Sequence, residues 1–233
     1  MWSYSEIELK MPQEVITPKA NPLWFAFCRW LTKVVIFNCY GRFTSIGDEN
    51  VPRTGAAIIA PVHVSHLDPP AVACGSARQM RYMAKEELFR KKWARILISS
   101  LGAFPVKRGE GDTESIRISL EMLKQGEALV LFPEGTRGDG KTLLPISRGV
   151  AMLAKKTKVP IIPVGIIGTH TRMPVGTLKI KRGDVTVVYG TPFTYDEVAT
   201  SENERENREI FSNFLATRIV ELCNQHGFDI KTS

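Results

Sequence analysis

The sequence predicts an α/β domain with a mostly parallel, mixed sheet flanked by helices. Three observations support this fold class: the chain has 233 residues, 43% of them are hydrophobic, and beyond Gly41 short apolar runs alternate with longer helical stretches. The length and the apolar content suit one ordinary hydrophobic core and exclude disorder over the whole chain.

The first forty residues predict an appendage to that domain. Residues 1–20 are polar and mixed, which is typical of an arm. The next segment, residues 23–40, reads LWFAFCRWLTKVVIFNCY, and its two cations lie four residues apart on one helical face. We interpret it as an amphipathic helix lying in a membrane interface, with a core-packing helix that has a basic outer stripe as the alternative. The side chains expected to contact the membrane are Trp24, Phe25, Arg29, Trp30 and Lys33.

Within the domain, each apolar run bounded by turn residues is a predicted strand. These runs are residues 55–61, 80–84, 128–132 and 161–167, with a hairpin-like pair around residues 181–184. Helical stretches fill the gaps, at residues 69–75, 85–100, 113–125, 147–157 and 203–225.

The composition predicts an anionic partner. Lys and Arg number 31 against 24 Asp and Glu, a net charge of +7 with a pI near 9.3. A membrane surface, a phosphorylated metabolite and nucleic acid all fit this charge, but no nucleic-acid-binding motif is present, so nucleic acid is not an expected partner. The four cysteines form no C-x-x-C pair and the first residues do not resemble a signal peptide, which predicts reduced thiols in the cytosol. No stretch reaches about 18 uninterrupted apolar residues, so a conventional transmembrane helix is not expected.

A histidine and an aspartate follow the first predicted strand, in the segment PVHVSHLDPP of residues 61–70. In a continuous helix His63 and Asp68 would lie about 140° apart, so the two side chains can meet only in a turn. A carboxylate there could hold one imidazole nitrogen and leave the other to take a proton from a hydroxyl. Asp68 as the N-cap of the next helix is a second role compatible with the first, and His66 competes with His63.

A second candidate site lies where another apolar strand ends, in the segment ALVLFPEGTRG of residues 128–138. The ends of parallel strands are where open α/β sheets bind ligands. Arg137 could grip a phosphate, and Gly135 and Gly138 would let the backbone approach an anion closely. The cations that follow Gly102, at positions 107 and 108, form a further candidate phosphate clamp. A solvated turn and a solvated basic pair are the alternatives.

Other chemistries compete with these interpretations. His63, His66 and Asp68 are possible metal ligands that His170 or His226 could complete, but further ligands with suitable spacing are not evident, so no metal is predicted. A serine hydrolase is disfavoured because no G-x-S-x-G motif occurs. A non-enzymatic module that binds anionic lipid would explain the charge but not the pairing of histidine with aspartate.

Together, and in this order, the blocks resemble the 1-acylglycerol-3-phosphate acyltransferases, also called lysophosphatidic acid acyltransferases. His63 and Asp68, with Ser65 between them, look like the H-x4-D block of that family. Val62 departs from the pattern, because many members carry Asn before the histidine.

Three later segments carry the rest of the resemblance. Lys107 and Arg108 resemble the second block of the family, and FPEGTR at residues 132–137 is similar to the third. The segment VPIIPV at residues 159–164 looks like the fourth. The resemblance therefore spans about a hundred residues, from His63 to Val164.

The resemblance implies that a fatty acyl group passes from acyl-CoA or acyl carrier protein to the free hydroxyl of lysophosphatidic acid, making phosphatidic acid in phospholipid biosynthesis. His63 would be the general base and Asp68 its orienter. The acceptor phosphate would be bound by Arg108, Glu134, Gly135 and Arg137, with Ser65, Lys107 and Thr136 as auxiliary residues.

The resemblance implies no cofactor beyond the thioester co-substrate. Another acceptor, such as glycerol 3-phosphate or a different lysophospholipid, is the alternative within the family. The chain then divides into an arm with an interfacial helix, residues 1–41, and a catalytic domain, residues 42–233. The expected location is the cytoplasmic face of a membrane, as a peripheral or monotopic protein.

Overall fold

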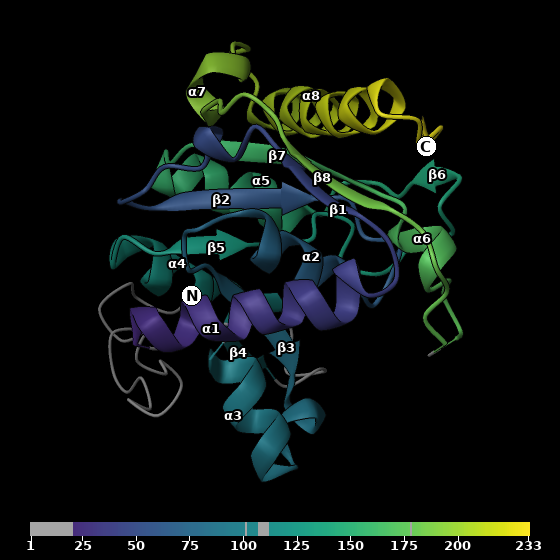
Figure 1. Ribbon diagram of the computed structural model, residues 1–233. Coiled ribbons are helices and arrows are strands. Elements are labelled where there is room, and N and C mark those ends of the chain that lie inside the picture. The colour runs from purple at the N-terminus through teal and green to yellow at the C-terminus, as the bar shows by residue number, and fades with distance from the viewer. Residues whose placement is uncertain (1–20, 101, 107–111, 178) are drawn as a thin grey trace.

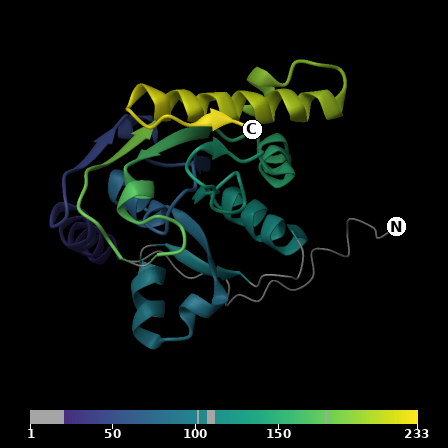
Figure 2. The ribbon, with the colours of Figure 1, turned by 90° about the vertical axis from the view of Figure 1, so that its right-hand side faces the viewer.

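A seven-stranded sheet forms the centre of the structure, with helices on both of its faces (Figures 1 and 2). The computed structural model describes residues 21–100, 102–106, 112–177 and 179–233. The strands of the sheet are β1 (Phe43–Ile46), β2 (Ala57–Pro61), β3 (Arg81–Lys85), β4 (Ala103–Val106), β5 (Ala128–Val130), β7 (Ile161–Ile167) and β8 (Val185–Tyr189). A separate pair consists of β6 (Thr142–Leu143) and β9 (Lys231–Thr232).

The strand order is β1-β8-β7-β2-β5-β3-β4, and every neighbouring pair is parallel except β7 with β8, which is antiparallel. The sheet is therefore mixed and mostly parallel, which confirms the predicted fold class. All five residues of β2 are buried, as expected for a central strand that is covered on both faces. The carboxyl ends of β2, β5, β3, β4 and β7 consequently meet at one edge of the sheet.

Helices cover both faces. The α-helices are α1 (Pro22–Thr32), α2 (Asp68–Gly75), α3 (Lys92–Ser100), α4 (Asp112–Lys124), α5 (Arg148–Thr157), α6 (Thr169–Arg172), α7 (Tyr195–Val198) and α8 (Glu204–Gln225). Helices α4 and α5 lie on the side of the sheet opposite α1, and α8 runs along one end of the molecule (Figure 2). Shorter turns are the π-helix Lys33–Asn38 and the 3-10 helices Asp48–Asn50 and Glu86–Phe89.

Most predicted elements within the domain agree with the structure, but two are wrong and several short elements were not expected. The hairpin-like pair around residues 181–184 is wrong, because this turn leads into β8, whose partners are the distant strands β7 and β1. The helix expected at residues 85–100 is divided into the end of β3, a 3-10 turn and α3. The short strands β1, β4, β6 and β9 and the short helices α6 and α7 were not expected, since two to four residues carry too little pattern to predict an element.

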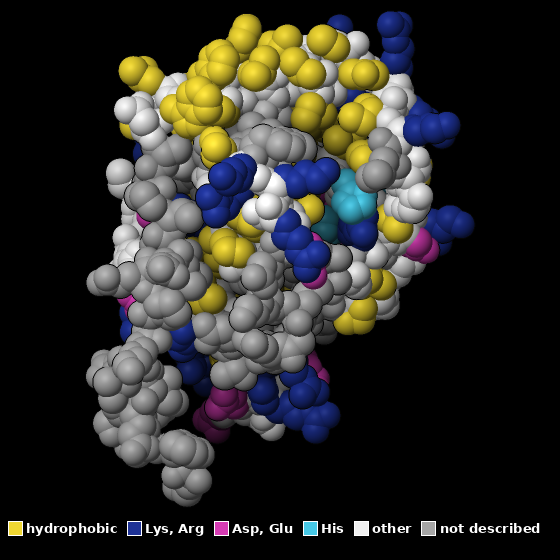
Figure 3. All heavy atoms as spheres, turned by 90° about the horizontal axis from the view of Figure 1, so that it is seen from below, with side chains coloured by type: hydrophobic (Ala, Val, Ile, Leu, Met, Phe, Trp, Pro, Cys, Tyr) yellow, Lys and Arg dark blue, Asp and Glu magenta, His cyan; other side chains and the backbone are white. Residues whose placement is uncertain are grey.

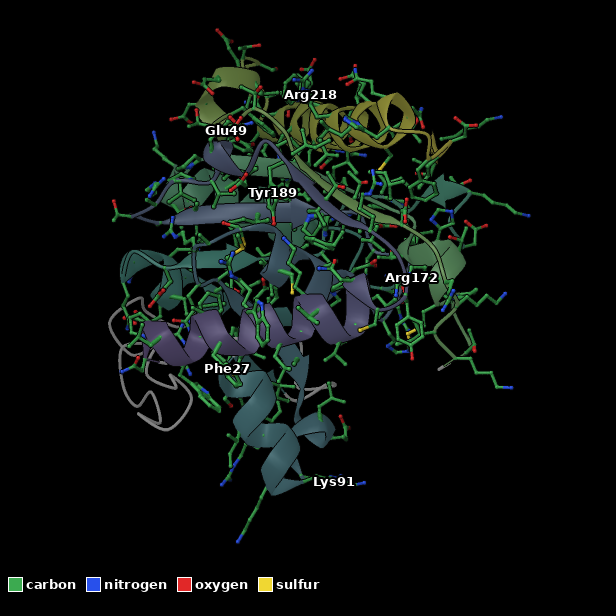
Figure 4. All side chains as sticks on the ribbon, viewed as in Figure 1. Phe27, Glu49, Lys91, Arg172, Tyr189 and Arg218 are labelled. Atoms are coloured by element: carbon green, nitrogen blue, oxygen red, sulfur yellow. The ribbon has the colours of Figure 1, made fainter. Side chains whose placement is uncertain are left out.

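Helix α1 packs one stripe against the domain and exposes another. Phe25 and Cys28 are buried, whereas Leu23, Trp24, Phe27, Trp30 and Leu31 of α1 and Val35 of the π-helix that follows are exposed. We call these six exposed side chains the apolar ridge. Phe27 lies on the lower side of α1 in Figure 4. Phe25 is only 5% exposed, so its assignment as a membrane contact is wrong: the helical period turns it toward the domain. Within the described part of the chain, no helix is both long enough and apolar enough to cross a membrane.

A buried arginine fixes the end of the N-terminal segment to the domain. Arg172 of α6 donates from Nη2 to the carbonyl of Ile36 at 2.6 Å and from Nε to the carbonyl of Lys181 at 3.2 Å. Its guanidinium also lies 5.5 Å from the ring centre of Phe37 and 5.8 Å from that of Tyr40. Figure 4 labels Arg172 beside this junction. The contacts hold the segment that follows α1 against the domain although it lies far away in sequence.

The central strand predicts a large stability cost for truncation. Ile59 is fully buried in β2, whereas Ile46 at the end of β1 is 41% exposed. We expect Ile59→Ala to lower the free energy of unfolding by about 2–5 kcal/mol, because the surrounding strands cannot close the cavity. We expect Ile46→Ala to cost under about 1 kcal/mol. Urea unfolding followed by circular dichroism measures both, and equal losses would contradict the buried position of β2.

Candidate active site

The loop between β2 and α2 brings His63 and Asp68 together. Nδ1 of His63 lies 3.0 Å from Oδ2 of Asp68, although the two residues are five positions apart. The same oxygen accepts hydrogen bonds from the backbone N–H groups of Val64 and Ser65, each at 2.7 Å. The turn required for the pair to meet is thus built around the carboxylate itself.

The Asp68 side chain does not cap helix α2. The helix begins at Asp68, its N-cap position is Leu67, and the carboxylate bonds to N–H groups that precede the helix. The expected N-cap role is therefore wrong, because the carboxylate accepts from N–H groups of the preceding loop and not from those of the first turn of the helix. Asp68 is fully buried, and its Oδ1 has no hydrogen-bond partner among the described residues. Such a carboxylate is held rigidly and faces the imidazole rather than solvent.

The ring of His63 is fixed from a second side. It stacks on Phe132 with ring centres 4.0 Å apart, and its side chain is 18% exposed. Since Nδ1 faces Asp68, Nε2 is the nitrogen left to exchange a proton with a ligand. An imidazole held in one orientation in this way has the geometry that a general base requires.

Glu134 joins the loop after β5 to the loop after β2. Its Oε1 accepts from the backbone N–H of His63 at 2.7 Å, and its Oε2 accepts from the N–H of Leu144 at 3.0 Å. The carboxylate is 8% exposed, and burial raises the pKa of Glu134 against the lowering effect of these two hydrogen bonds. The assignment of Glu134 as a phosphate ligand is wrong in this geometry, because both oxygens are used within the protein and a carboxylate repels phosphate.

Two glycines shape the same loop. Gly138 donates its N–H to the carbonyl of His63 at 2.8 Å, and a Cβ at Gly138 would lie 3.1 Å from Oε2 of Glu134. The backbone at Gly138 therefore approaches an anion closely, as expected, but that anion is the protein's own carboxylate. Gly135 is exposed and adopts φ +68°, a left-handed conformation that a side chain would strain.

The remaining predicted residues are distributed around this pair. Arg137 is half-buried, and its Nη1 contacts Nε2 of His66. Thr136 is exposed on the same loop. Ser65 is buried, donates to the carbonyl of Met173 at 2.8 Å and accepts from the N–H of Leu67 at 3.1 Å, so it stabilises the loop from within. Lys107 and Arg108 lie outside the described residues.

An apolar pocket opens beside His63. Its volume is about 490 Å³, and it is lined chiefly by apolar side chains of β3, α4, β5 and α5 together with His63 and Arg148. Arg148 is exposed at the start of α5 and was missed by sequence reasoning. The only signal was its place directly after Ser147, which begins a predicted helix. The pocket can hold a long apolar group with its polar end at the imidazole.

A metal centre is not formed by the described side chains, which contain no group of three His, Cys, Asp or Glu placed to hold one ion. His226, a proposed distant ligand, instead places Nδ1 2.9 Å from the carbonyl of Leu222. His170 stacks on Phe228 with ring centres 4.1 Å apart.

Comparisons with known proteins cover most of this architecture. A family model described as Acyltransferase matches residues 42–167. The chain is 30% identical over 202 residues to the 1-acyl-sn-glycerol-3-phosphate acyltransferase of Bacillus subtilis, covering 86% of this chain and 98% of that protein. It is 26% identical over 192 residues to the protein of the same name from Streptococcus pneumoniae, covering 81% and 69%. The crystal structure of the 1-acyl-sn-glycerophosphate (LPA) acyltransferase PlsC from Thermotoga maritima matches with a TM-score of 0.70 and 27% identity, over 85% of this chain and 79% of that one.

The role of Glu134 predicts a stability effect. We expect Glu134→Ala to lower the free energy of unfolding by about 1–3 kcal/mol, since it removes the acceptor of two backbone N–H groups in the loops. Thr136→Ala, two residues away and exposed, should change it by less than about 0.5 kcal/mol. Urea unfolding measures the difference, and equal values for the two variants would contradict a structural role for Glu134.

Proposed function

Because the chain belongs to the acyltransferase family, we propose that it transfers a fatty acyl group from a thioester to the free hydroxyl of 1-acylglycerol 3-phosphate. The products are phosphatidic acid and a free thiol. The acceptor is proposed from the names of the relatives in Bacillus subtilis and Streptococcus pneumoniae and of the Thermotoga maritima structure. The observation that carries the chemistry is the contact of 3.0 Å between His63 and the buried Asp68, beside an apolar pocket.

His63 acts as the general base in this proposal. Nε2 takes the proton of the acceptor hydroxyl as the oxygen attacks the thioester carbonyl. The tetrahedral intermediate then expels the thiolate, which takes a proton from the imidazolium. The carboxylate of Asp68 accepts the hydrogen bond of Nδ1–H and stabilises the imidazolium, and no covalent acyl-enzyme is needed. Because a thiolate is already a good leaving group, positioning of the two substrates supplies much of the acceleration.

The apolar pocket is proposed to bind the acyl donor, and the basic residues are proposed to bind the acceptor. The apolar pocket beside His63 suits a fatty acyl chain, with the carbonyl at its mouth. Arg137, beside His66 on the same side of the site, is proposed to neutralise the acceptor phosphate. Arg108 is proposed for the same role on the family resemblance alone. Glu134 is proposed as a positioning residue that holds the backbone of His63.

We propose further that the apolar ridge docks the protein on a bilayer surface. The ridge lies on the same side of the molecule as α3, and exposed Arg90, Lys91, Lys92 and Arg95 lie at and just before that helix. Figure 3 shows hydrophobic side chains gathered in a band along one edge of this face, with Lys, Arg and His side chains beside them. Aromatic side chains with neighbouring cations are typical of helices that rest in an interface. Docking by this face would bring the site to the lipid acceptor.

The proposed base predicts a loss of turnover. With a fatty acyl thioester on CoA or on acyl carrier protein, thiol release should depend on added lysophosphatidic acid. We expect His63→Ala and Asp68→Asn each to lower kcat by about 10²–10⁴, whereas His226→Ala, a histidine outside the site, should keep it.

Three outcomes of that assay decide the proposal. Release that does not depend on acceptor would indicate a thioesterase and contradict acyl transfer. Equal rates with glycerol 3-phosphate or another lysophospholipid would contradict the proposed acceptor. Full turnover by His63→Ala would exclude the base. The faster of the two carriers identifies the donor.

Docking predicts a loss of vesicle binding. Trp24 and Trp30 are 45% and 58% exposed on the ridge. We expect the double replacement by Glu to weaken binding to phospholipid vesicles by more than tenfold, because the variant loses the apolar area that both indole rings would bury in the bilayer. Phe214→Glu on α8, 37% exposed at the other end of the molecule, is the control and should bind as the wild type does. Sedimentation with vesicles measures this, and unchanged binding of the Trp variant would overturn the docking role.

A further inference from the structure

A second cavity lies at the opposite edge of the sheet from His63. Its volume is about 400 Å³, and its walls come from α1 and from the loops that precede β2, β3 and β5. These three strands are parallel neighbours, so their amino ends meet at one edge and the catalytic loops at the other. The five residues of β2 alone separate the two edges by about 16 Å. The cavity is therefore not part of the active site, and we call it the basic cavity.

The lining of the basic cavity is positively charged. It contains Arg29, Arg53 and Arg78, and no acidic side chain is among the described residues that line it. Arg78 donates to the backbone carbonyls of the surrounding loops, including Gly126 at 3.2 Å, and Arg29 donates to the carbonyl of Ser76 at 2.9 Å. Carbonyl acceptors satisfy hydrogen bonds but do not cancel charge. Glu127, which pairs with Arg81 behind the wall, offsets part of the charge of Arg78. The described residues offer no such carboxylate to Arg29 or Arg53, so these two arginines give the cavity its excess of positive charge.

Arg53 is the cation of the basic cavity best placed to receive a ligand. It is exposed and forms no ion pair with any described residue. Nε2 of Gln79 lacks a hydrogen-bond partner within the described part of the chain, but this atom is buried, so a ligand in the cavity does not contact it. An anion in the cavity would accept hydrogen bonds from the Arg53 guanidinium.

Helix α1 relates the basic cavity to the bilayer. Pro22, Phe25, Ala26 and Arg29 line the cavity at the spacing of one helical stripe, while the apolar ridge occupies the exposed stripe of the same helix. A headgroup in the cavity could therefore have acyl chains that continue along the ridge. Gly55 and Gly126 leave the floor without side chains, and a Cβ at Gly126 would meet nothing closer than 4.0 Å.

We propose that the basic cavity binds the phosphate of an anionic glycerophospholipid, at a site separate from the acceptor site. The guanidinium groups of Arg29 and Arg53 would donate to the phosphate oxygens. The phosphate chemistry stands on the cavity itself, and its assignment to a lipid rests on the proposed docking of α1. A choline headgroup is disfavoured, because its cation would face three arginines.

The test compares vesicles of phosphatidylcholine with and without phosphatidylglycerol, an anionic phosphodiester that is not the proposed product. No acyl donor is added, and His63→Ala serves as the background, so the result does not depend on turnover. The preference for phosphatidylglycerol is the ratio of the affinities for vesicles with and without that lipid. We expect this ratio to fall about fivefold in Arg53→Gln and about 30-fold when Arg29→Gln is added, because each arginine near an anionic surface contributes about 1 kcal/mol. Arg53 lies on the surface, so the single variant should fold normally.

Lys156→Gln is the matched control, since Lys156 is exposed on α5, on the side of the sheet opposite α1, and does not line the cavity. This variant should lose less than twofold of the preference for phosphatidylglycerol. An equal loss in Lys156→Gln and Arg53→Gln would indicate diffuse attraction and would overturn the site. Loss of docking itself would lower binding to both kinds of vesicle and leave their ratio unchanged, which distinguishes the two failures.

A second experiment, with phosphate in solution instead of vesicles alone, distinguishes a lipid phosphate from a free phosphate as the ligand. Inorganic phosphate should compete weakly with phosphatidylglycerol vesicles for the wild-type protein and raise its melting temperature little. A large, Arg53-dependent rise in melting temperature without any preference for phosphatidylglycerol would identify a free phosphate as the ligand and overturn the assignment to lipid.

Discussion

The buried carboxylate of Asp68 is the constraint on which the active-site side of this protein depends. One oxygen, Oδ2, accepts from two backbone N–H groups and faces Nδ1 of His63, so a single atom fixes both the loop and the imidazole. Burying a carboxylate is costly unless hydrogen bonds compensate. The loop supplies them at short range, and Glu134 repeats the arrangement one loop away by accepting from the N–H of His63 and of Leu144. Two buried carboxylates thus hold the backbone of His63, the proposed general base.

The parallel sheet explains why those two loops meet. Strands β2 and β5 are neighbours although Ala57 and Ala128 are 71 positions apart in the sequence, and parallel neighbours end at the same edge. That edge gathers the imidazole, the glycine-containing loop and an apolar pocket. The opposite edge gathers the loops that form the basic cavity under α1. One topology therefore places the proposed site of acyl transfer and the proposed site for a second lipid headgroup at opposite edges of the sheet.

Several residues of the predicted site have a structural role instead of the ligand-binding role that their residue type suggested. Glu134, Ser65 and Gly138 belong to the expected motifs, yet each is used to hold the protein's own backbone: Glu134 as an acceptor, Ser65 against Met173, and Gly138 against the carbonyl of His63. Phe25 shows the same effect in α1, where the helical period turns it inward between exposed neighbours. A motif specifies which residues gather at a site, but partners that are distant in sequence decide which of them face the ligand.

The sequence by itself determined the fold class, most of the longer helices and strands, and the identity of the histidine and aspartate that meet. These features are local: apolar periodicity is read within one element, and a spacing of five residues permits only a turn between His63 and Asp68. The tertiary structure alone decided that β8 joins β7 and β1 instead of forming a hairpin, that Arg148 lines the pocket beside His63, and that Arg29, Arg53 and Arg78 share one cavity. Each of these depends on which strands become neighbours, and that choice is set by the packing of the whole core, because no single segment carries the information.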